Sequence, residues 1–275
     1  MTNPTAMPTR LEDVDFGLQE LPGETLHATL RAFREQSPIE PTRFLGLPSF
    51  VITRHDALEA AFLDEHVFPG HRMYQASFEP AIGKSFISDP DPASHLLLRK
   101  LATPAFRSRA VASYVASGLA TLASELVDGL EGRDEVDLVK DYAARFPYLV
   151  ISRLLGLPRD REDEFHAWAI ALFNFREDPA RAVEARKSLS ELILPILEDR
   201  RRAPRNDVIS ELLAAEVDGR KLTDEEILSH VRLLFPTGGE TTHGSLGNLL
   251  SALFLHDGAW ERIVRNPGDI PATVA

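Results

Sequence analysis

Residues 233–244 read LLFPTGGETTHG and lie in the middle of a long amphipathic helix pattern. Upstream, Thr223 and Glu226 have the spacing of a capping box, in which each side chain satisfies a free amide at the helix start. Apolar residues at helical spacing follow this start and resume after the glycines. We therefore predict one helix over 224–256, about 50 Å long, which could cross a whole domain.

The middle of this predicted helix contains residues that weaken helices. Pro236 has no amide hydrogen to donate, and Gly238-Gly239 loses backbone entropy without a side chain to pack. The hydroxyls of Thr241 and Thr242 stand where they can bond carbonyl groups one turn earlier, which a kink would free. We interpret the stretch as a break in the helix, with a groove where a flat ligand approaches bare backbone.

Glu240 and Thr241 have two compatible interpretations. A carboxyl group beside a hydroxyl can relay protons to a reacting group. Alternatively, the threonine repairs the backbone of a kinked helix and the glutamate pairs with an arginine. The residues alone do not choose between these interpretations.

A second candidate site follows the turn Asp91-Pro92. His95 and Arg99 are four residues apart, so they share one face of a predicted helix. An imidazole and a guanidinium on the same face suit a carboxylate or a phosphate. An exposed cationic stripe is the alternative, because most surface charges bind no ligand.

Composition limits the possible functions. The 275 residues are 44% hydrophobic and 26% charged, which is ordinary for a globular protein. A formal net charge of −12 argues against sequence-independent nucleic-acid binding, which needs a basic surface. Because we find no apolar run of about 20 residues and no signal peptide, we predict a cytoplasmic protein without membrane contact. The chain has no cysteine, which excludes disulfides, zinc–thiolate sites and cysteine nucleophiles within it. The histidine spacings also predict no metal site.

The remaining pattern predicts a mainly α fold with a small β element. We expect a flexible tail over 1–10, a β pair over 39–53 with strands at 39–44 and 50–53, and an aromatic-rich substrate loop over 64–88. Besides the central helix, helices are predicted over 23–36, 55–63, 93–101, 110–130, 138–155, 161–173, 180–202, 208–215 and 258–265.

Together, these motifs resemble those of cytochromes P-450. Thr237-Gly238-Gly239-Glu240-Thr241-Thr242 resembles the central-helix motif of that family, Ala/Gly-Gly-x-Asp/Glu-Thr-Thr/Ser. His95-Leu96-Leu97-Leu98-Arg99 resembles the family's His-x-x-x-Arg helix, which holds a haem propionate. The order of the elements also matches the soluble bacterial branch, from about residue 11 onward.

The resemblance implies a haem-thiolate monooxygenase that hydroxylates or epoxidises a small apolar substrate. It implies haem b, dioxygen and an electron donor of the ferredoxin or flavodoxin type. Catalytic proton delivery for O–O cleavage would fall to Glu240 and Thr241. The cofactor would be bound by His95, Arg99, Gly238, Gly239 and Thr242. The substrate pocket would include Phe78, Phe173, Leu233 and Thr237.

The sequence departs from the family in three respects. The family's iron-binding cysteine and its Glu-x-x-Arg helix are both absent, and Thr237 replaces the usual Ala or Gly. We therefore expect 11–275 to form a single incomplete helical domain, truncated before the Glu-x-x-Arg helix and inactive by itself. A haem-free α-helical protein that binds a small molecule, or a non-catalytic remnant, is the alternative.

Overall fold

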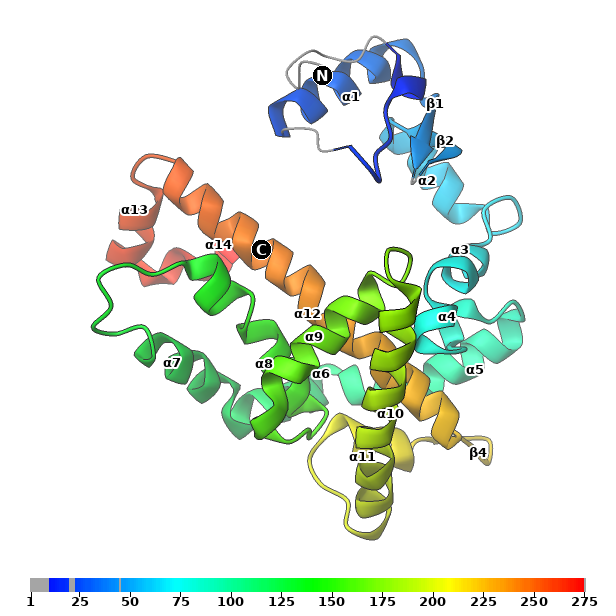
Figure 1. The fold of residues 1–275 in the computed structure, drawn as a ribbon, viewed down its shortest axis with the longest axis vertical. Coiled ribbons are helices and arrows are strands. Elements are labelled where there is room, and N and C mark those ends of the chain that lie inside the picture. Colours follow the sequence, from blue (N-terminus) through cyan, green and yellow to red (C-terminus); the bar gives the residue numbers. More distant parts are fainter. Residues whose placement is uncertain (1–9, 20–22, 45, 275) are drawn as a thin grey trace. The chain divides into compact units, whose positions relative to one another are not determined.

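The computed structural model describes residues 10–19, 23–44 and 46–274 (Figure 1). The flexible tail predicted for 1–10 lies outside these residues, apart from Arg10. Backbone contacts group the chain into two compact units, 1–70 and 71–275. The fold is mainly α with small β elements, as predicted. The single domain predicted for 11–275 stays a prediction.

The first unit combines two α-helices with a two-stranded antiparallel sheet. Its small core contains Leu11, Val14 and Phe33, against which Val51 packs. The predicted helices over 23–36 and 55–63 are confirmed. The described elements are η1 (Leu11–Asp13), α1 (Gly23–Gln36), β1 (Ile39–Phe44), β2 (Leu47–Ile52) and α2 (His55–Leu63).

Strand β2 begins three residues earlier than predicted. Leu47 already pairs with Phe44, and Pro48 pairs with Arg43, so the turn between the strands is tighter than the sequence suggested. Gly46 has a φ of 79° in this turn, a conformation that glycine adopts without strain.

The second unit is almost entirely helical. Its α-helices are α3 (Gly70–Ser77), α4 (Glu79–Ile82), α5 (Pro92–Ala102), α6 (Ser108–Tyr114), α7 (Ala120–Asp128), α8 (Phe146–Leu154), α9 (Glu162–Phe173), α10 (Pro179–Arg202), α11 (Val208–Ala214), α12 (Asp224–Leu255), α13 (Ala259–Arg265) and α14 (Ile270–Val274). Shorter turns are η2 (Phe86–Ser88), η3 (Thr103–Phe106), η4 (Val115–Leu119), η5 (Val139–Ala143), η6 (Arg159–Arg161) and η7 (Pro267–Asp269). Two short antiparallel strands, β3 (Glu216–Val217) and β4 (Arg220–Lys221), flank a turn at Asp218-Gly219.

Three parts of the second unit differ from the sequence prediction. The segment predicted as a loop over 64–88 contains α3, α4 and η2. The helix predicted over 110–130 is divided, because Gly118 has a φ of 117° within the π-helical turn η4. The helix predicted over 138–155 is likewise divided, into η5 and α8.

The central helix α12 runs without interruption for 32 residues. Its capping box is confirmed, since Glu226 N donates to Thr223 Oγ1 at 3.3 Å and Thr223 N donates to Glu226 Oε2 at 2.7 Å. The break predicted in its middle was wrong, because helical backbone continues through Pro236. The threonine hydroxyls of this region bond carbonyls one turn earlier, as predicted for Thr241 and Thr242.

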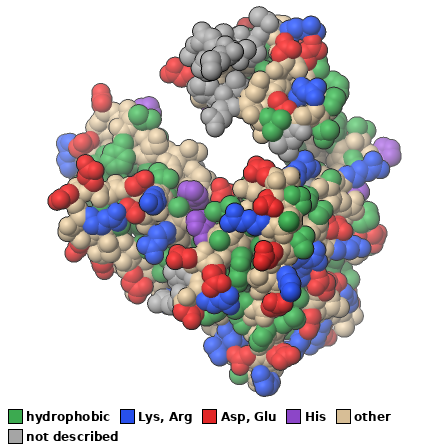
Figure 2. Space-filling view, viewed as in Figure 1, with side chains coloured by type: hydrophobic (Ala, Val, Ile, Leu, Met, Phe, Trp, Pro, Cys, Tyr) green, Lys and Arg blue, Asp and Glu red, His purple; other side chains and the backbone are tan. Residues whose placement is uncertain are grey.

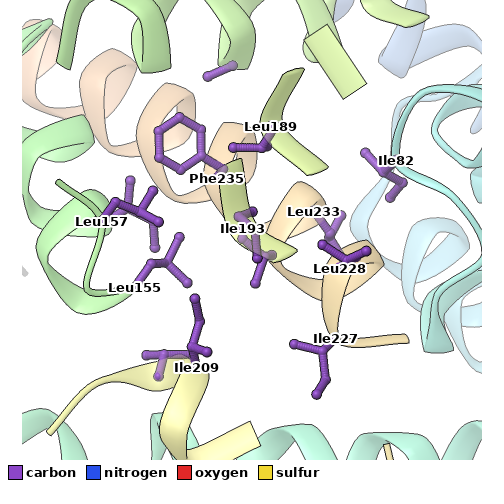
Figure 3. Close-up of a cluster of buried hydrophobic side chains, with 14 of the residues drawn as sticks. Ile82, Leu155, Leu157, Leu189, Ile193, Ile209, Ile227, Leu228, Leu233 and Phe235 are labelled. Atoms are coloured by element: carbon purple, nitrogen blue, oxygen red, sulfur yellow. The ribbon is translucent and has the colours of Figure 1, made fainter. Parts of the chain in front are cut away.

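The main core surrounds the first half of α12 (Figure 3). This core includes Leu228, Leu233 and Phe235 of α12 together with Leu189 and Ile193 of α10. The aromatic ring of Phe235 also meets the rings of Phe165 and Tyr148, at centroid distances of 5.9 and 6.2 Å. This packing fixes the position of the helix that carries the predicted proton relay.

The surface carries charges of both signs. Figure 2 shows lysine, arginine and acidic side chains interspersed over the face in view. Among the described residues, no helix has both the length and the apolar character that crossing a membrane would require.

Candidate functional site

Glu240 is held by a residue of another helix. The phenol of Tyr148, on α8, donates a hydrogen bond to Glu240 Oε2 at 3.1 Å. Tyr148 is 4% exposed, whereas 38% of the Glu240 side chain is accessible. Glu240 therefore accepts a hydrogen bond from a buried phenol, while part of its own side chain stays accessible to solvent.

The pKa of Tyr148 favours this direction of donation. Burial raises the pKa of the phenol well above its usual range, and the negative charge of Glu240 raises it further. The phenol is therefore protonated at neutral pH and acts as the donor to the carboxylate.

The two glycines of the motif make room for α8. A Cβ atom at position 239 would lie 2.2 Å from Cε1 of Tyr148, which is sterically impossible without movement. A Cβ atom at position 238 would lie 3.4 Å from Cδ1 of Ile151. On that side, the predicted groove of bare backbone is filled by α8, because the glycines let the two helices approach closely. The assignment of Gly238 and Gly239 to cofactor binding stays a prediction.

Two histidines lie beside the Glu240 carboxylate and the Tyr148 ring. His243 Nδ1 is 3.9 Å from Glu240 Oε2 and has no hydrogen-bond partner among the described residues. The His166 ring, on α9, lies 4.5 Å from the Tyr148 ring. Burial lowers the pKa of His166 and nearby His243 lowers it further, while Glu240 and Asp163 act in the opposite direction. These contacts form a cluster of titratable groups around Glu240.

The hydroxyls of Thr241 and Thr242 are engaged with the backbone. Thr241 Oγ1 donates to the Thr237 carbonyl at 2.6 Å, and Thr242 Oγ1 donates to the Gly238 carbonyl at 3.0 Å. Both threonines are exposed. Because its proton is used in this way, the Thr241 oxygen is available as an acceptor for a ligand.

A pocket of about 440 Å³ lies along the first half of α12. Leu233 and Thr237, predicted to line a substrate pocket, both line this one, and so does Arg99. Its other lining residues, mostly apolar, are Tyr74, Phe86, Ile87, Ala102, Thr103, Phe106, Leu212, His230 and Leu234. The structure thus brings the predicted anion-binding arginine and two predicted substrate contacts to one cavity. That the cavity takes substrate or cofactor stays a prediction.

The other predicted site residues lie outside this lining. His95 is half-buried, with its ring edge against Phe86 at a centroid distance of 5.8 Å. Phe78 and Phe173 meet each other edge to face at 6.4 Å. Phe78 also contacts Tyr74 at 5.7 Å, so this aromatic pair adjoins the pocket through one lining residue.

Sequence reasoning missed Tyr148 and His230. Tyr148 stands in the apolar run of α8, where only its hydroxyl, which needs a partner when buried, signals a polar contact. His230 lines the pocket and is 3% exposed, and its Nε2 atom has no hydrogen-bond partner among the described residues. Burial lowers the pKa of His230 to about 4, against an opposing effect of Glu226, so the imidazole is neutral at pH 7.

No family model matches the chain, but individual proteins do. The polyketide biosynthesis cytochrome P450 PksS of Bacillus subtilis is 30% identical over 263 residues, 90% of this chain and 64% of the relative. Cyclomarin C epoxidase CymV of Salinispora arenicola is 30% identical over 92% of this chain and 66% of the relative. This chain therefore spans about two thirds of the length of these relatives.

Solved structures show the same relationship. The structure of cytochrome P450 CYP109Q5 from Chondromyces apiculatus matches with a TM-score of 0.78 and 30% identity. The match covers 92% of this chain and 65% of that one. Given this agreement between sequence and structure over nine tenths of its length, the chain belongs to the cytochrome P450 family.

Proposed function

We propose that the protein carrying this chain is a haem-thiolate monooxygenase that hydroxylates or epoxidises a small, largely apolar organic molecule. The observation that carries the proposal is the pocket beside α12, in which an apolar lining is combined with the cation of Arg99. Relatives in the family include a hydroxylase and an epoxidase. Because the chain spans 64% of the first relative's length, the activity of the whole protein is part of the proposal.

The residues of the pocket fit haem, the cofactor that the family implies. Haem is a flat apolar molecule with anionic propionates, so it needs an apolar cavity with a cation at its edge. Arg99 supplies that cation, and no carboxylate of the described residues forms an ion pair with it. When bound, haem would supply the activation of dioxygen. No thiolate for its iron is available among these 275 residues, which contain no cysteine.

The remaining chemistry would come from the chain's own side chains. Arg99 and His95 would bind a propionate, and the apolar wall around Leu233 would exclude water from the substrate. The Thr241 oxygen would accept a hydrogen bond from a ligand above the helix. Glu240 would exchange protons with solvent through its accessible carboxylate. The electron donor would be a ferredoxin- or flavodoxin-type protein.

A haem titration followed by absorbance tests the cofactor site. Arg99→Gln should weaken haem binding by about tenfold, because one charge-assisted contact is lost. Arg107→Gln is the matched control, since Arg107 is exposed and does not line the pocket. Equal affinities for the two variants would remove Arg99 from the site. A protein that takes up apolar ligands but no haem would support the haem-free binding alternative.

The proton relay has its own test in the holoenzyme. Glu240→Gln and Thr241→Ala should each lower the product formed per electron consumed, with peroxide or water released instead. The measurement compares electron consumption with product yield at saturating substrate. Tight coupling in both variants would contradict the assignment of Glu240 and Thr241.

A further inference from the structure

The Glu240 carboxylate has an asymmetric environment. Its Oε2 atom accepts the hydrogen bond from Tyr148 and is the atom nearest to His243. Its Oε1 atom has no hydrogen-bond partner among the described residues. The two oxygens of one carboxylate are therefore distinguished by a contact between two helices.

The position of the Tyr148 phenol is set by packing on several sides. Gly239 lies against the ring so closely that no side chain fits at that position. The rings of His166 and Phe235 contact it from α9 and α12, at 4.5 and 6.2 Å. A side chain enclosed in this way keeps one rotamer, so its hydroxyl is aimed at Glu240 before any ligand binds.

We propose that Tyr148 is a positioning residue for Glu240, which holds Oε2 so that Oε1 is the oxygen that exchanges protons with the site. Tyr148 does not give up its own proton in this arrangement; it restricts the carboxylate to the orientation useful for the relay. Gly239 contributes to the same arrangement, because the absence of a side chain there leaves room for the phenol ring. The inference rests on the proposed function of Glu240.

The test is a double-mutant cycle in the holoenzyme that contains this chain. Tyr148→Phe keeps the ring against Gly239 and removes only the hydroxyl. We expect the product formed per electron to fall by up to about tenfold, the effect of losing one hydrogen bond to a charged group. In a Glu240→Gln background the same substitution should cause no further loss, because the group that it positions is already inactive.

Tyr142→Phe is the matched control. This substitution also removes a half-buried tyrosine hydroxyl, here in the neighbouring η5 turn. The Tyr142 ring stacks on Phe146 at a centroid distance of 5.5 Å. This variant should keep normal coupling and a normal KM. A merely structural role of Tyr148 would lower activity equally in both backgrounds, with unchanged coupling, and would overturn the inference.

The outcomes separate the inference from the proposed function. If Glu240→Gln uncouples the enzyme and Tyr148→Phe does not, the proposed relay stands and the role of Tyr148 is refuted. If Glu240→Gln itself stays coupled, the relay and the inference both fail.

A spectroscopic measurement makes the contact testable even if Tyr148→Phe does not fold. Ultraviolet resonance Raman spectra report whether a tyrosine donates a hydrogen bond. The tyrosine signal should change when Glu240 is replaced by Ala in a protein that keeps Tyr148. An unchanged signal would refute the contact.

Discussion

The two halves of α12 have similar apolar patterns and opposite environments. The described residues bury almost every position from Ile227 to Gly239, whereas they bury none from Glu240 to Leu255. Helices α8, α9 and α10 pack against this helix, and the main core that they form with it contains Ile227 and Phe235 but no residue after position 239. In the second half Phe254 and Leu255 are 58% and 78% exposed. Hydrophobic spacing therefore predicts the helix, while α8, α9 and α10 determine which part of it the described residues bury.

The difference between the halves should appear most strongly when an aromatic ring is removed. Phe235→Ala should destabilise the protein by about 3–5 kcal/mol, because Phe235 is fully buried between Phe165 and Tyr148. Phe254→Ala should cost less than about 1 kcal/mol, since its ring is exposed and stacks only on Trp260 among the described residues. Denaturant unfolding of both variants measures the contrast, and similar losses would refute it.

A pH titration of stability should detect the buried histidine of the first half. The pKa of His230 is lowered to about 4 in the folded protein, so the unfolded chain takes up its proton first as the pH falls below about 6.5. At pH 7 the histidine is neutral in both states and hardly changes the free energy of unfolding. This free energy should fall by about 3 kcal/mol as the pH is lowered to 4. His230→Leu should flatten the acid side of the stability curve. A wild-type slope in that variant would mean that His230 is not protected from protonation.

Replacing glycine by alanine should change stability in opposite directions in the two halves of α12. Gly239→Ala places a methyl group within the Tyr148 ring, so it should destabilise the protein by about 1–3 kcal/mol. Gly244 has nothing within 4 Å of its Cβ position. Gly244→Ala should therefore stabilise the helix by about 0.5–1 kcal/mol. Thermal melts of the pair test this, and a stabilising Gly239→Ala would disprove the close approach of α8.

The sequence predicted the helices with clear local signals. Thr223 and Glu226 predicted the N-terminus of α12, and Asp91-Pro92 predicted the N-terminus of α5. The sequence prediction failed where one residue changes the backbone direction. Periodicity predicted one helix over 110–130, but Gly118, with a φ of 117°, divides it. It also misjudged Pro236, because Pro236 removes only one amide and the packing around it holds the remaining helical backbone in place.

The candidate site shows the same limit. The motif from Thr237 to Thr242 could be found in the sequence because its residue types and spacing are unusual for a core helix. Tyr148 could not be found, since it is 92 residues from Glu240 along the chain and its neighbours in α8 are mostly apolar.

Local chemistry thus established the helix, its cap and the candidate acid–alcohol pair, because these depend on residues a few positions apart. Tertiary packing decided that Gly239 receives the Tyr148 ring, that Arg99 meets Leu233 and Thr237 at one cavity, and that the described residues bury only the first half of α12. Those outcomes depend on which distant helices come together, and no short-range pattern encodes that.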